Sequence, residues 1–457
     1  MKKEKQPYFL VIGLGASGIS MAKFLRSKGK TIIATDIDAS KTKIAQELNG
    51  LGIKTEIGFH DQKTFNLASV MVPSPGIPKT NKFIKTAFDL GVGITGELDI
   101  FTRYNDLPVI AITGTNGKTT TTTLINDILK SCGYTPFVGG NIGTPLVDHL
   151  MNKGKTDVIV AEISSFQLDI SRQFRPDVGV LLNISQDHLD RYENYQEYES
   201  SKWSIFKHQK PSDKAVINKS INKFDALSKQ LKSEIFTFSS DKDFLINCNA
   251  RIDSKSIKII TRELNYTIKT NQLKELQGTH NKENVAAAVL ACLALGADIN
   301  EIVKGLETFK NLPHRMEFIK TIDGISFYND SKGTNTDAVI RAINCFEKNI
   351  ILILGGREKG TDFSLLTNDI QHSVKTIIAM GECRTLIKDT FKNICPVLEV
   401  HTMKEAVQTA FNTAFKDDAG EPAIVLLSPA CASFDMYKNY AHRGNDFVTL
   451  VNALGNK

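Results

Sequence analysis

A predicted junction between a strand and a helix carries the sequence Thr113-Gly114-Thr115-Asn116-Gly117-Lys118-Thr119-Thr120. The apolar run before it, Val109–Ile112, is typical of a buried strand, and the apolar spacing of Thr121–Lys130 favours a helix after it. Glycines in such a loop let backbone N–H groups approach a polyphosphate, whose negative charge is favoured at the N-terminus of a helix. Lys118 would reach the outer phosphates, and Thr119 would offer its hydroxyl to Mg²⁺.

The match to a complete phosphate-binding loop is imperfect, because Ile112 stands where the pattern has its first glycine. A tight strand-to-helix turn capped by Thr or Asn is the alternative interpretation. The combination of Gly117, Lys118 and the paired threonines favours nucleotide phosphate binding over that alternative. The sequence therefore predicts a nucleotide site at the end of this strand.

The size and composition of the chain limit the number of domains and the kind of protein to expect. At 457 residues it exceeds what one core usually organises, so we expect two or three domains. The formal charge of +6, from 56 basic and 50 acidic residues, is spread out, and no basic block resembles a nucleic-acid-binding arm. The seven cysteines lack metal-ligand spacing, so we expect reduced thiols. No membrane span or signal peptide is recognisable near the N-terminus, which favours a cytoplasmic protein without membrane insertion.

A second glycine-rich loop lies near the N-terminus. The strand predicted at Tyr8–Ile12 leads into Gly13-Leu14-Gly15-Ala16-Ser17-Gly18, and a second strand ends before Asp36. This pattern is the dinucleotide fingerprint, with the acid placed to accept a ribose hydroxyl. The glycines encode only a close approach to phosphate, so NAD and a nucleotide diphosphate are indistinguishable here. Pro73–Pro78 follows another strand and is either a ligand loop or a proline-stiffened turn.

Polar groups follow the next predicted strands. Glu162 ends the strand predicted at Asp157–Ala161, where it would either bind Mg²⁺ opposite the phosphate loop or favour the dipole of a helix N-terminus. Val138–Gly143, which includes Asn141, is predicted to be a glycine loop near a ligand. The segment Asn183–Tyr192 crowds two acids and a histidine beyond a strand end, and such groups are costly to bury unless they bind a cation or one another. Considered alone, Lys202 on a predicted helix over Tyr198–His208 is a solvated lysine.

The last third of the chain begins with a helix that carries two amides. Asn281 and Asn284 would share one face of its first turn, where they could recognise adenine or cap the helix. A boundary is predicted near Pro313, after which strands and helices alternate as in a second doubly wound unit. Three polar clusters follow its strands: Asn329–Asn335, Gly355–Gly360 and Ser428–Asp435.

The chain resembles the Mur ligases over its whole length. The motifs shared with this family are Gly114–Thr120, Glu162–Leu168, Asn183–Asp190, His280–Asn284 and Pro313-His314-Arg315. Two more, Asp330–Asn335 and Leu427–Asp435, resemble the branch that joins D-glutamate to UDP-N-acetylmuramoyl-L-alanine. Seven motifs in the expected order are much more specific than any one of them.

The resemblance implies an α/β protein of three domains. Residues 1–96 would form a Rossmann-like parallel sheet for the UDP-linked substrate, residues 97–311 a P-loop ATPase-type domain, and residues 312–457 a Rossmann-like domain for D-glutamate. The substrate carboxylate would attack the γ-phosphorus of ATP, and the amine of D-glutamate would displace phosphate through a tetrahedral intermediate. The cofactors implied are ATP and two Mg²⁺ ions, and the partners are small molecules only, bound by a monomer.

The resemblance also implies roles for individual residues. Those implied for ATP are Gly114, Thr115, Asn116, Gly117, Lys118, Thr119, Thr120, Asn281, Asn284, Arg315 and Asp330. Those implied for the UDP-linked substrate are Gly15, Ala16, Ser17, Asp36, Ser74, Gly76, Asn141 and His188. Those implied for D-glutamate are Lys332, Thr334, Lys359, Ser433, Phe434 and Tyr440. The metal-site residues would be Thr119, Glu162, His188 and Lys202, and the catalytic residues Lys118, Glu162, His188 and Lys202.

In the family, the lysine at the position of Lys202 is typically carbamylated, which would turn a repelling cation into an anion beside Mg²⁺. Cations are required because carboxylate and triphosphate repel each other.

Three other functions are alternatives to this one. An NAD-dependent oxidoreductase would use Gly13–Gly18 and Asp36 but would leave the phosphate loop and the last third of the chain unexplained. A nucleotide-controlled binding module would bind ATP without ligation. A sibling ligase would add another amino acid, or extend folate with glutamate, and would carry other sequences at Asp330–Asn335 and Ser428–Asp435.

Overall fold

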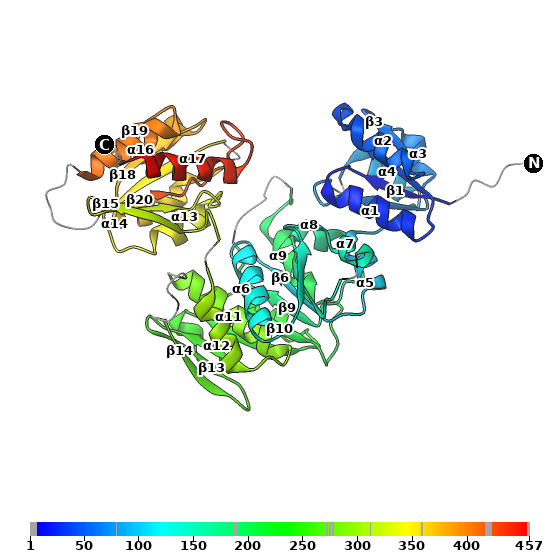
Figure 1. Ribbon diagram of the computed structural model, residues 1–457, viewed down its shortest axis with the longest axis horizontal. Coiled ribbons are helices and arrows are strands. Elements are labelled where there is room, and N and C mark those ends of the chain that lie inside the picture. The colour runs from blue at the N-terminus through cyan, green and yellow to red at the C-terminus, as the bar shows by residue number, and fades with distance from the viewer. Residues whose placement is uncertain are drawn as a thin grey trace, which may run out of the picture. The chain divides into compact units, whose positions relative to one another are not determined.

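The computed structural model describes residues 7–78, 80–152, 154–185, 191–270, 273, 276, 278–310, 312–357, 360–415 and 423–454 (Figure 1). These residues form an α/β fold with three sheets. The chain divides into two compact units. One unit comprises Met1–Gln272 and Glu283–Thr308, and the other comprises Leu273–Lys282 and Phe309–Lys457.

The first sheet is parallel throughout, in the order β3-β2-β1-β4-β5. Its strands are β1 (Phe9–Ile12), β2 (Ile32–Asp36), β3 (Lys54–Ile57), β4 (Val70–Pro73) and β5 (Gly93–Ile94), with helices α1 (Ala16–Ser27), α2 (Thr42–Gly50), α3 (Gln62–Asn66) and α4 (Lys82–Asp89). Val11 packs into one apolar core, whereas Leu10 and Ile12 pack into another on the opposite face. A strand covered on both faces explains why its sequence is continuously apolar.

The second sheet has the order β14-β13-β12-β11-β10-β9-β6-β8-β7. Its strands are β6 (Val109–Thr113), β7 (Pro136–Gly140), β8 (Val158–Glu162), β9 (Val178–Leu181), β10 (Lys214–Asn218), β11 (Glu234–Ser239), β12 (Ala250–Ile252), β13 (Ser256–Ile260) and β14 (Asn265–Lys269). Pairing is parallel from β7 to β12 and antiparallel from β12 to β14. All five residues of β6 are buried, as a central parallel strand requires.

Helices pack around this sheet and complete the first unit. They are α5 (Glu97–Tyr104), α6 (Lys118–Ser131), α7 (Leu146–Met151), α8 (Ser165–Ile170), α9 (Tyr195–Trp203), α10 (Phe224–Ser228), α11 (Thr279–Ala294) and α12 (Ile299–Thr308). Residues 279–282 at the start of α11 are the exception, since they are grouped with the second unit. Helices α6 and α12 lie side by side (Figure 1).

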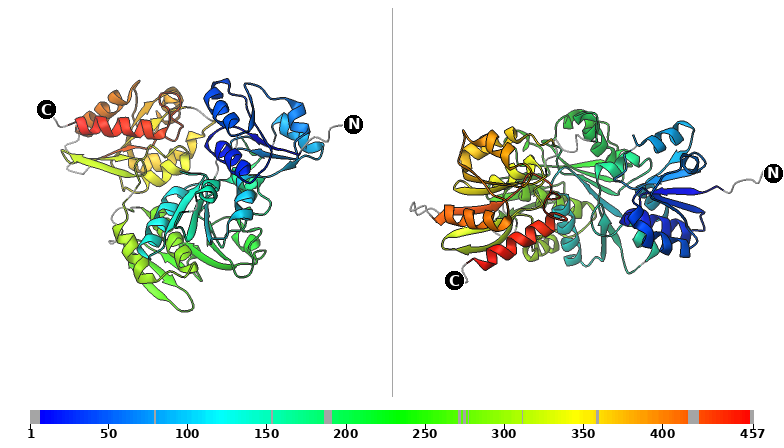
Figure 2. Two further views of the ribbon diagram at one scale, coloured as in Figure 1. Left: turned by 45° about the vertical axis from the view of Figure 1, so that its right-hand side comes forward. Right: turned by 90° about the horizontal axis from the view of Figure 1, so that it is seen from above.

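The third sheet has the order β15-β16-β20-β17-β18-β19, with β15 antiparallel to β16 and the other pairs parallel. Its strands are β15 (Glu317–Ile322), β16 (Ile325–Asn329), β17 (Ile350–Gly355), β18 (Val374–Met380), β19 (Val397–Glu399) and β20 (Ala423–Leu427). The helices are α13 (Thr336–Ile343), α14 (Thr367–Ser373), α15 (Arg384–Phe391), α16 (Met403–Phe415) and α17 (Tyr440–Ala453). Helices α16 and α17 pack together in this unit, in orange and red (Figure 2).

The predicted α/β class and its alternating elements are confirmed, but local details differ. The expected loop at Val138–Gly143 is wrong in its first half, because Val138, Gly139 and Gly140 complete β7. Gly140 has φ +104°, and its backbone passes so close to the carbonyl of Glu162 that a Cβ would not fit. The glycine serves a close approach of two strands there. The helix containing Lys202 begins at Tyr195, since the side chain of Asn194 caps it by accepting the N–H of Glu197.

We expect Gly18→Ala to destabilise the first unit by about 1–3 kcal/mol, because a Cβ at Gly18 would overlap the carbonyl oxygen of Gly13. Gly15→Ala is the matched control, since Gly15 lies three residues earlier at the start of α1, has φ −77° and has open space around its Cβ direction. Thermal unfolding of both variants measures the difference. Equal melting temperatures for the two variants would contradict the steric argument.

Candidate active site

The loop between β6 and α6 curls around a lysine side chain. Nζ of Lys118, the first residue of α6, donates to the carbonyl oxygens of Gly114 and Thr115, both at 2.7 Å. Gly117 has φ +85°, a left-handed conformation that favours glycine. The side chain of Asn183 holds the opposite side of the loop, donating to the carbonyl of Asn116 at 3.0 Å and accepting its N–H at 2.9 Å. The predicted phosphate loop is therefore a fixed backbone cradle at the start of a helix.

A buried carboxylate lies beside this cradle. Glu162 is the last residue of β8, which pairs with β6 so that Ile112 faces Glu162 in the register. Its Oε2 accepts the hydroxyl of Thr119 at 2.7 Å, and its Oε1 accepts the amide Nδ2 of Asn141 at 2.9 Å. The structure thus brings together three predicted site residues, from α6, from the end of β8 and from the loop after β7.

The chemistry of these groups fits Mg²⁺, which prefers oxygen ligands and is usually held by one or two carboxylates plus phosphate. Thr119 and Glu162 supply a hydroxyl and a carboxylate within hydrogen-bond distance of each other at the phosphate loop. Among the described residues, no cluster of three or more His, Cys, Asp or Glu side chains suits a metal. Phosphate oxygens of a bound nucleotide would join this hydroxyl and this carboxylate around the ion.

Lys202 is buried, with only 2% of the residue exposed, so its interpretation as a solvated lysine is wrong. Its Nζ donates to the carbonyl of Gly114 at 2.9 Å and lies 4.6 Å from the ring centroid of Tyr198. The Tyr198 hydroxyl is 3.1 Å from Oγ1 of Thr115. Helix α9 therefore supports the phosphate loop from behind with a cation and an aromatic ring.

The amides of α11 are both buried. Asn284 borders the phosphate loop, where a Cβ at Gly117 would overlap its Oδ1. Asn281 belongs to the residues grouped with the second unit. The predictions for His188 and Lys359 lie outside the described residues.

The N-terminal glycine loop is braced by polar side chains. Oδ2 of Asp36 accepts the N–H of Leu14 at 2.6 Å, and Oγ of Ser74 donates to the carbonyl of Gly13 at 3.0 Å. Ser17 donates to Oε2 of the buried Glu97 at 3.2 Å. Ser17, Asp36 and Ser74 therefore all lie at this loop. The sequence predicts that Asp36 accepts a ribose hydroxyl, and in the structure its carboxylate accepts a backbone N–H of the loop.

In the second unit, Asp330 follows β16 and is buried. Its Oδ2 accepts the hydroxyl of Ser428 at 2.8 Å, and its Oδ1 accepts the N–H of Met316 at 3.3 Å. Burial raises the pKa of Asp330 to about 7, against the lowering effect of the Ser428 hydrogen bond. This carboxyl therefore changes protonation near neutral pH.

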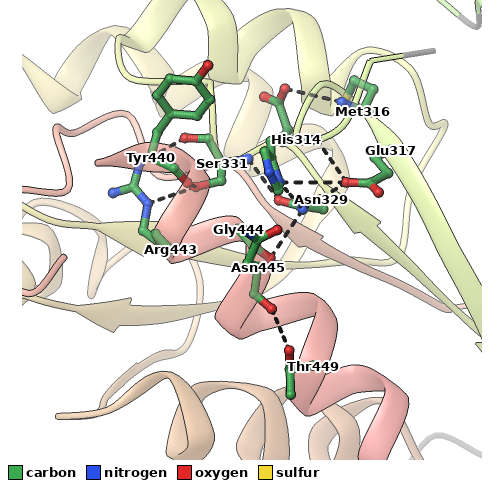
Figure 3. A network of polar contacts seen from close by, with 11 residues as sticks. His314, Met316, Glu317, Asn329, Ser331, Tyr440, Arg443, Gly444, Asn445 and Thr449 are labelled. Atoms are coloured by element: carbon green, nitrogen blue, oxygen red, sulfur yellow. Dashed lines mark hydrogen bonds and ion pairs between the residues drawn. The ribbon is translucent and has the colours of Figure 1, made fainter. Parts of the chain in front are cut away.

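A buried arginine joins two of the predicted polar loops, and Figure 3 shows its contact with the first of them, at Ser331. Arg443 on α17 is 2% exposed and donates to the carbonyl and the hydroxyl of Ser331 at 2.9 and 3.0 Å. It also donates twice to the carbonyl of Cys431, each time at 3.1 Å. Burial lowers the pKa of Arg443 to about 10, which still leaves it charged at neutral pH. The same network contains Asn329, whose Nδ2 lies 2.8 Å from Nδ1 of His314.

Of the residues predicted for D-glutamate, Tyr440 joins this network, because its carbonyl oxygen accepts the hydroxyl of Ser331 at 2.8 Å. Nζ of Lys332 is 3.9 Å from the ring centroid of Tyr440, a cation–π contact. Ser433 is buried, whereas Thr334 and Phe434 are exposed. The loops of Lys332 and Ser433 are linked, because Asp330 binds Ser428 and because Arg443 binds both Ser331 and Cys431.

Sequence reasoning missed several residues that shape these sites: Glu97, Asn183, Tyr198, Arg191 and Arg443. Asn183 lay within a polar segment that the sequence does mark, but its partner is 67 positions away. Arg443 had no local signal, because nothing in the sequence of a surface-like helix identifies one arginine as buried.

Comparison with known proteins matches three family descriptions along the chain. The Mur ligase MurD-like N-terminal domain matches residues 8–96, the Mur ligase middle domain 112–292, and the Mur ligase glutamate ligase domain 314–431. A UDP-N-acetylmuramoylalanine--D-glutamate ligase of Desulfosudis oleivorans is 40% identical over 97% of this chain and 96% of its own. A protein of the same name from Geotalea daltonii is 40% identical over 97% of both chains. The chain belongs to the Mur ligase family.

Solved structures support the fold of this Mur ligase. UDP-N-acetylmuramate-alanine ligase of Thermotoga maritima has a TM-score of 0.57 and 19% identity over 97% of this chain and 99% of its own. MurF of Acinetobacter baumannii has a TM-score of 0.60 and 17% identity, covering 86% of this chain and 93% of its own. In the described part of the Mur ligase, no helix has the length and apolar character needed to cross a membrane. All seven cysteines are free, as expected.

We expect Asp330→Asn to flatten the pH dependence of stability. The raised pKa means that folded protein keeps this proton at pH values where the unfolded chain has lost it. The free energy of unfolding contributed by Asp330 therefore falls as pH rises from about 4 to about 7 and levels off above that. Urea unfolding between about pH 5 and pH 8 measures the slope.

The matched control for this measurement is Asp323→Asn, an exposed acid in the same unit. It should keep the wild-type slope. If Asp330→Asn also keeps that slope, the raised pKa of Asp330 is wrong.

Proposed function

We propose that this protein joins D-glutamate to UDP-N-acetylmuramoyl-L-alanine, using ATP and releasing ADP and phosphate in peptidoglycan precursor synthesis. Full-length similarity to ligases named for that reaction supports the choice of substrates. The observation that carries the chemistry is the hydrogen bond between Thr119 and the buried Glu162 beside the phosphate loop. We further propose that the protein is a cytoplasmic monomer that acts on small molecules alone.

The reaction must bring a carboxylate to a triphosphate, and two anions repel each other unless positive charge lies between them. Lys118 supplies that charge from inside the loop, and the backbone of Gly114–Thr120 would hold the phosphates at the start of α6. Bound Mg²⁺ would neutralise the phosphate oxygens and orient the γ-phosphoryl group. Thr119 and Glu162 would hold this ion, and His188 a second one.

The first step transfers the γ-phosphoryl group to the alanyl carboxylate and yields an acyl-phosphate with ADP. In the second step the D-glutamate amine attacks the acyl carbon, and the tetrahedral intermediate collapses with loss of phosphate. The role of the protein is chiefly positioning and charge stabilisation. We assign adenosine and phosphate contacts to Asn281, Asn284, Arg315 and Asp330.

The two remaining substrates would meet the ATP site from different loops. We assign the UDP-linked substrate to residues 1–96 through Gly15, Ala16, Ser17, Asp36, Ser74 and Gly76, joined by Asn141 and His188. We assign D-glutamate to residues 312–457 through Lys332, Thr334, Lys359, Ser433, Phe434 and Tyr440. Residues 97–311 would hold ATP.

Carbamylation of Lys202 is part of this proposal. An unmodified ammonium beside Mg²⁺ would repel the metal, whereas a carbamate is an anion. The burial of Lys202 against Gly114 supports a role at the phosphate loop. A carbamate carbon signal from ¹³C-bicarbonate, seen in the wild type and lost in Lys202→Arg, would test the modification; no such signal would remove it from the mechanism.

Phosphate release is the decisive test of function. Purified protein with ATP, Mg²⁺ and UDP-N-acetylmuramoyl-L-alanine should release phosphate with D-glutamate and not with L-glutamate, L-lysine or L-alanine, and should give a heavier UDP-product. Release with another amino acid would instead identify a sibling ligase. ATP binding without turnover would favour the switch module, and a change in nicotinamide absorbance would favour an oxidoreductase.

We expect Glu162→Gln to lower kcat by about 100-fold or more, because the neutral amide loses the charge that would hold Mg²⁺. Asp157→Asn is the control: Asp157 directly precedes β8 at its other end, and its Oδ1 accepts the N–H of Thr135. Steady-state kinetics should show near wild-type kcat for Asp157→Asn. Equal losses in both variants would point to general damage of the sheet and not to a metal role.

A further inference from the structure

Arg191 makes a long-range contact that the proposed reaction does not use. Its Nη1 donates to the carbonyl of Gly76 at 3.0 Å and its Nη2 to the carbonyl of Pro75 at 3.3 Å. These partners lie 115 and 116 residues earlier in the chain, in the loop that follows β4. The guanidinium of Arg191 therefore donates to two successive carbonyls of Pro73–Pro78, which we call the proline loop.

The proline loop is held on its other side by the first sheet. The N–H of Ser74 donates to the carbonyl of Ile12 at 2.8 Å, and the N–H of Ile77 donates to the carbonyl of Ser74 at 2.9 Å, closing a turn. Pro75 has no N–H to fix its position, and Gly76 has neither a side chain nor a restricted backbone. A planar guanidinium with several donors suits two adjacent carbonyls in a way that an ammonium does not.

Aromatic rings hold the guanidinium in place. Its carbon lies 3.9 Å from the ring centroid of Phe166 on α8. Phe166 stacks on Tyr192, with centroids 6.0 Å apart and planes at 19°. The Tyr192 hydroxyl donates to Asp169 at 2.8 Å, on the same helix as Phe166. Helix α8 begins three residues after Glu162, the carboxylate beside the phosphate loop. The contact of Arg191 with Phe166 therefore connects the proline loop to the chain segment that carries Glu162.

We propose that Arg191 is a positioning residue that keeps the proline loop in the shape that binds the UDP-linked substrate. This inference rests on the proposed function, which assigns Ser74 and Gly76 to that substrate. Arg191 acts through the two carbonyls and takes no part in the transfer of phosphate. Its loss frees Pro75 and Gly76 and weakens binding of the UDP-linked substrate, while the phosphate loop keeps its own contacts to Lys118 and Asn183.

The experiment compares Arg191→Ala and Arg191→Lys with the wild type. The readouts are KM for each of the three substrates, kcat, and calorimetric binding of UDP-N-acetylmuramoyl-L-alanine alone. We expect Arg191→Ala to raise KM and Kd for the UDP-linked substrate about tenfold, the loss expected for hydrogen bonds from a charged donor. Arg191→Lys should give KM and Kd values between those of the wild type and of Arg191→Ala. A lysine keeps the positive charge but lacks the planar guanidinium that can donate to both carbonyls. KM for ATP and kcat should change much less.

Arg172→Ala is the matched control, because Arg172 is an exposed arginine of the same unit that also faces an aromatic ring, 6.0 Å from Phe88. It should bind the substrate like the wild type.

If Arg191→Ala does not fold, Phe166→Leu keeps the test open, since it removes the ring support and should also raise Kd for the UDP-linked substrate. Unchanged Kd in the folded variants, or an equal rise in KM for all three substrates, overturns the inference. Failure of the wild type itself to bind the UDP-linked substrate overturns the proposed function instead.

Discussion

Two lysine ammonium groups share one backbone acceptor, the carbonyl oxygen of Gly114. Lys118 reaches it at 2.7 Å from the front of the loop, and Lys202 reaches it at 2.9 Å from α9 behind. Like charges at such distances raise each other's energy, and burial of Lys202 adds a desolvation cost. A polyphosphate beside the loop lowers the electrostatic cost at Lys118, and the proposed carbamylation of Lys202 would remove the second positive charge. Lys118 and the start of α6 thus give the loop its preference for anions.

The order of strands in the second sheet explains why the site assembles at all. Strand β6 lies between β8 and β9, and the register places Glu162 opposite Ile112 and Leu181 opposite Thr113. Parallel strands end at one edge, so the phosphate loop, Glu162 and Asn183 emerge side by side although they are far apart in sequence. Glu162 and Asn183 therefore lie within hydrogen-bond distance of Thr119 and Asn116.

The sequence predicted those features that are local. The phosphate loop and the place of Glu162 follow from apolar runs that end in glycine or in a carboxylate. Burial of Lys202 did not follow, because the segment Tyr195–Trp203 is polar and has no clear apolar face. The raised pKa of Asp330 was equally hidden, since it comes from burial in the folded protein, where even the opposing hydrogen bond from Ser428 comes from 98 positions away. Assigned contacts to substrates remain predictions, because they concern groups that come from outside the chain.

The buried Arg443 has a consequence for how the loops that it joins can change. It binds the loop after β16 through Ser331 and the loop after β20 through Cys431, so each loop supplies part of its acceptors. Three of the four hydrogen bonds that it donates to Ser331 and Cys431 go to main-chain carbonyls, so Arg443 depends mainly on the backbone path of each loop. A change that moves the backbone of one loop would therefore leave the buried guanidinium short of partners and disturb the other loop as well.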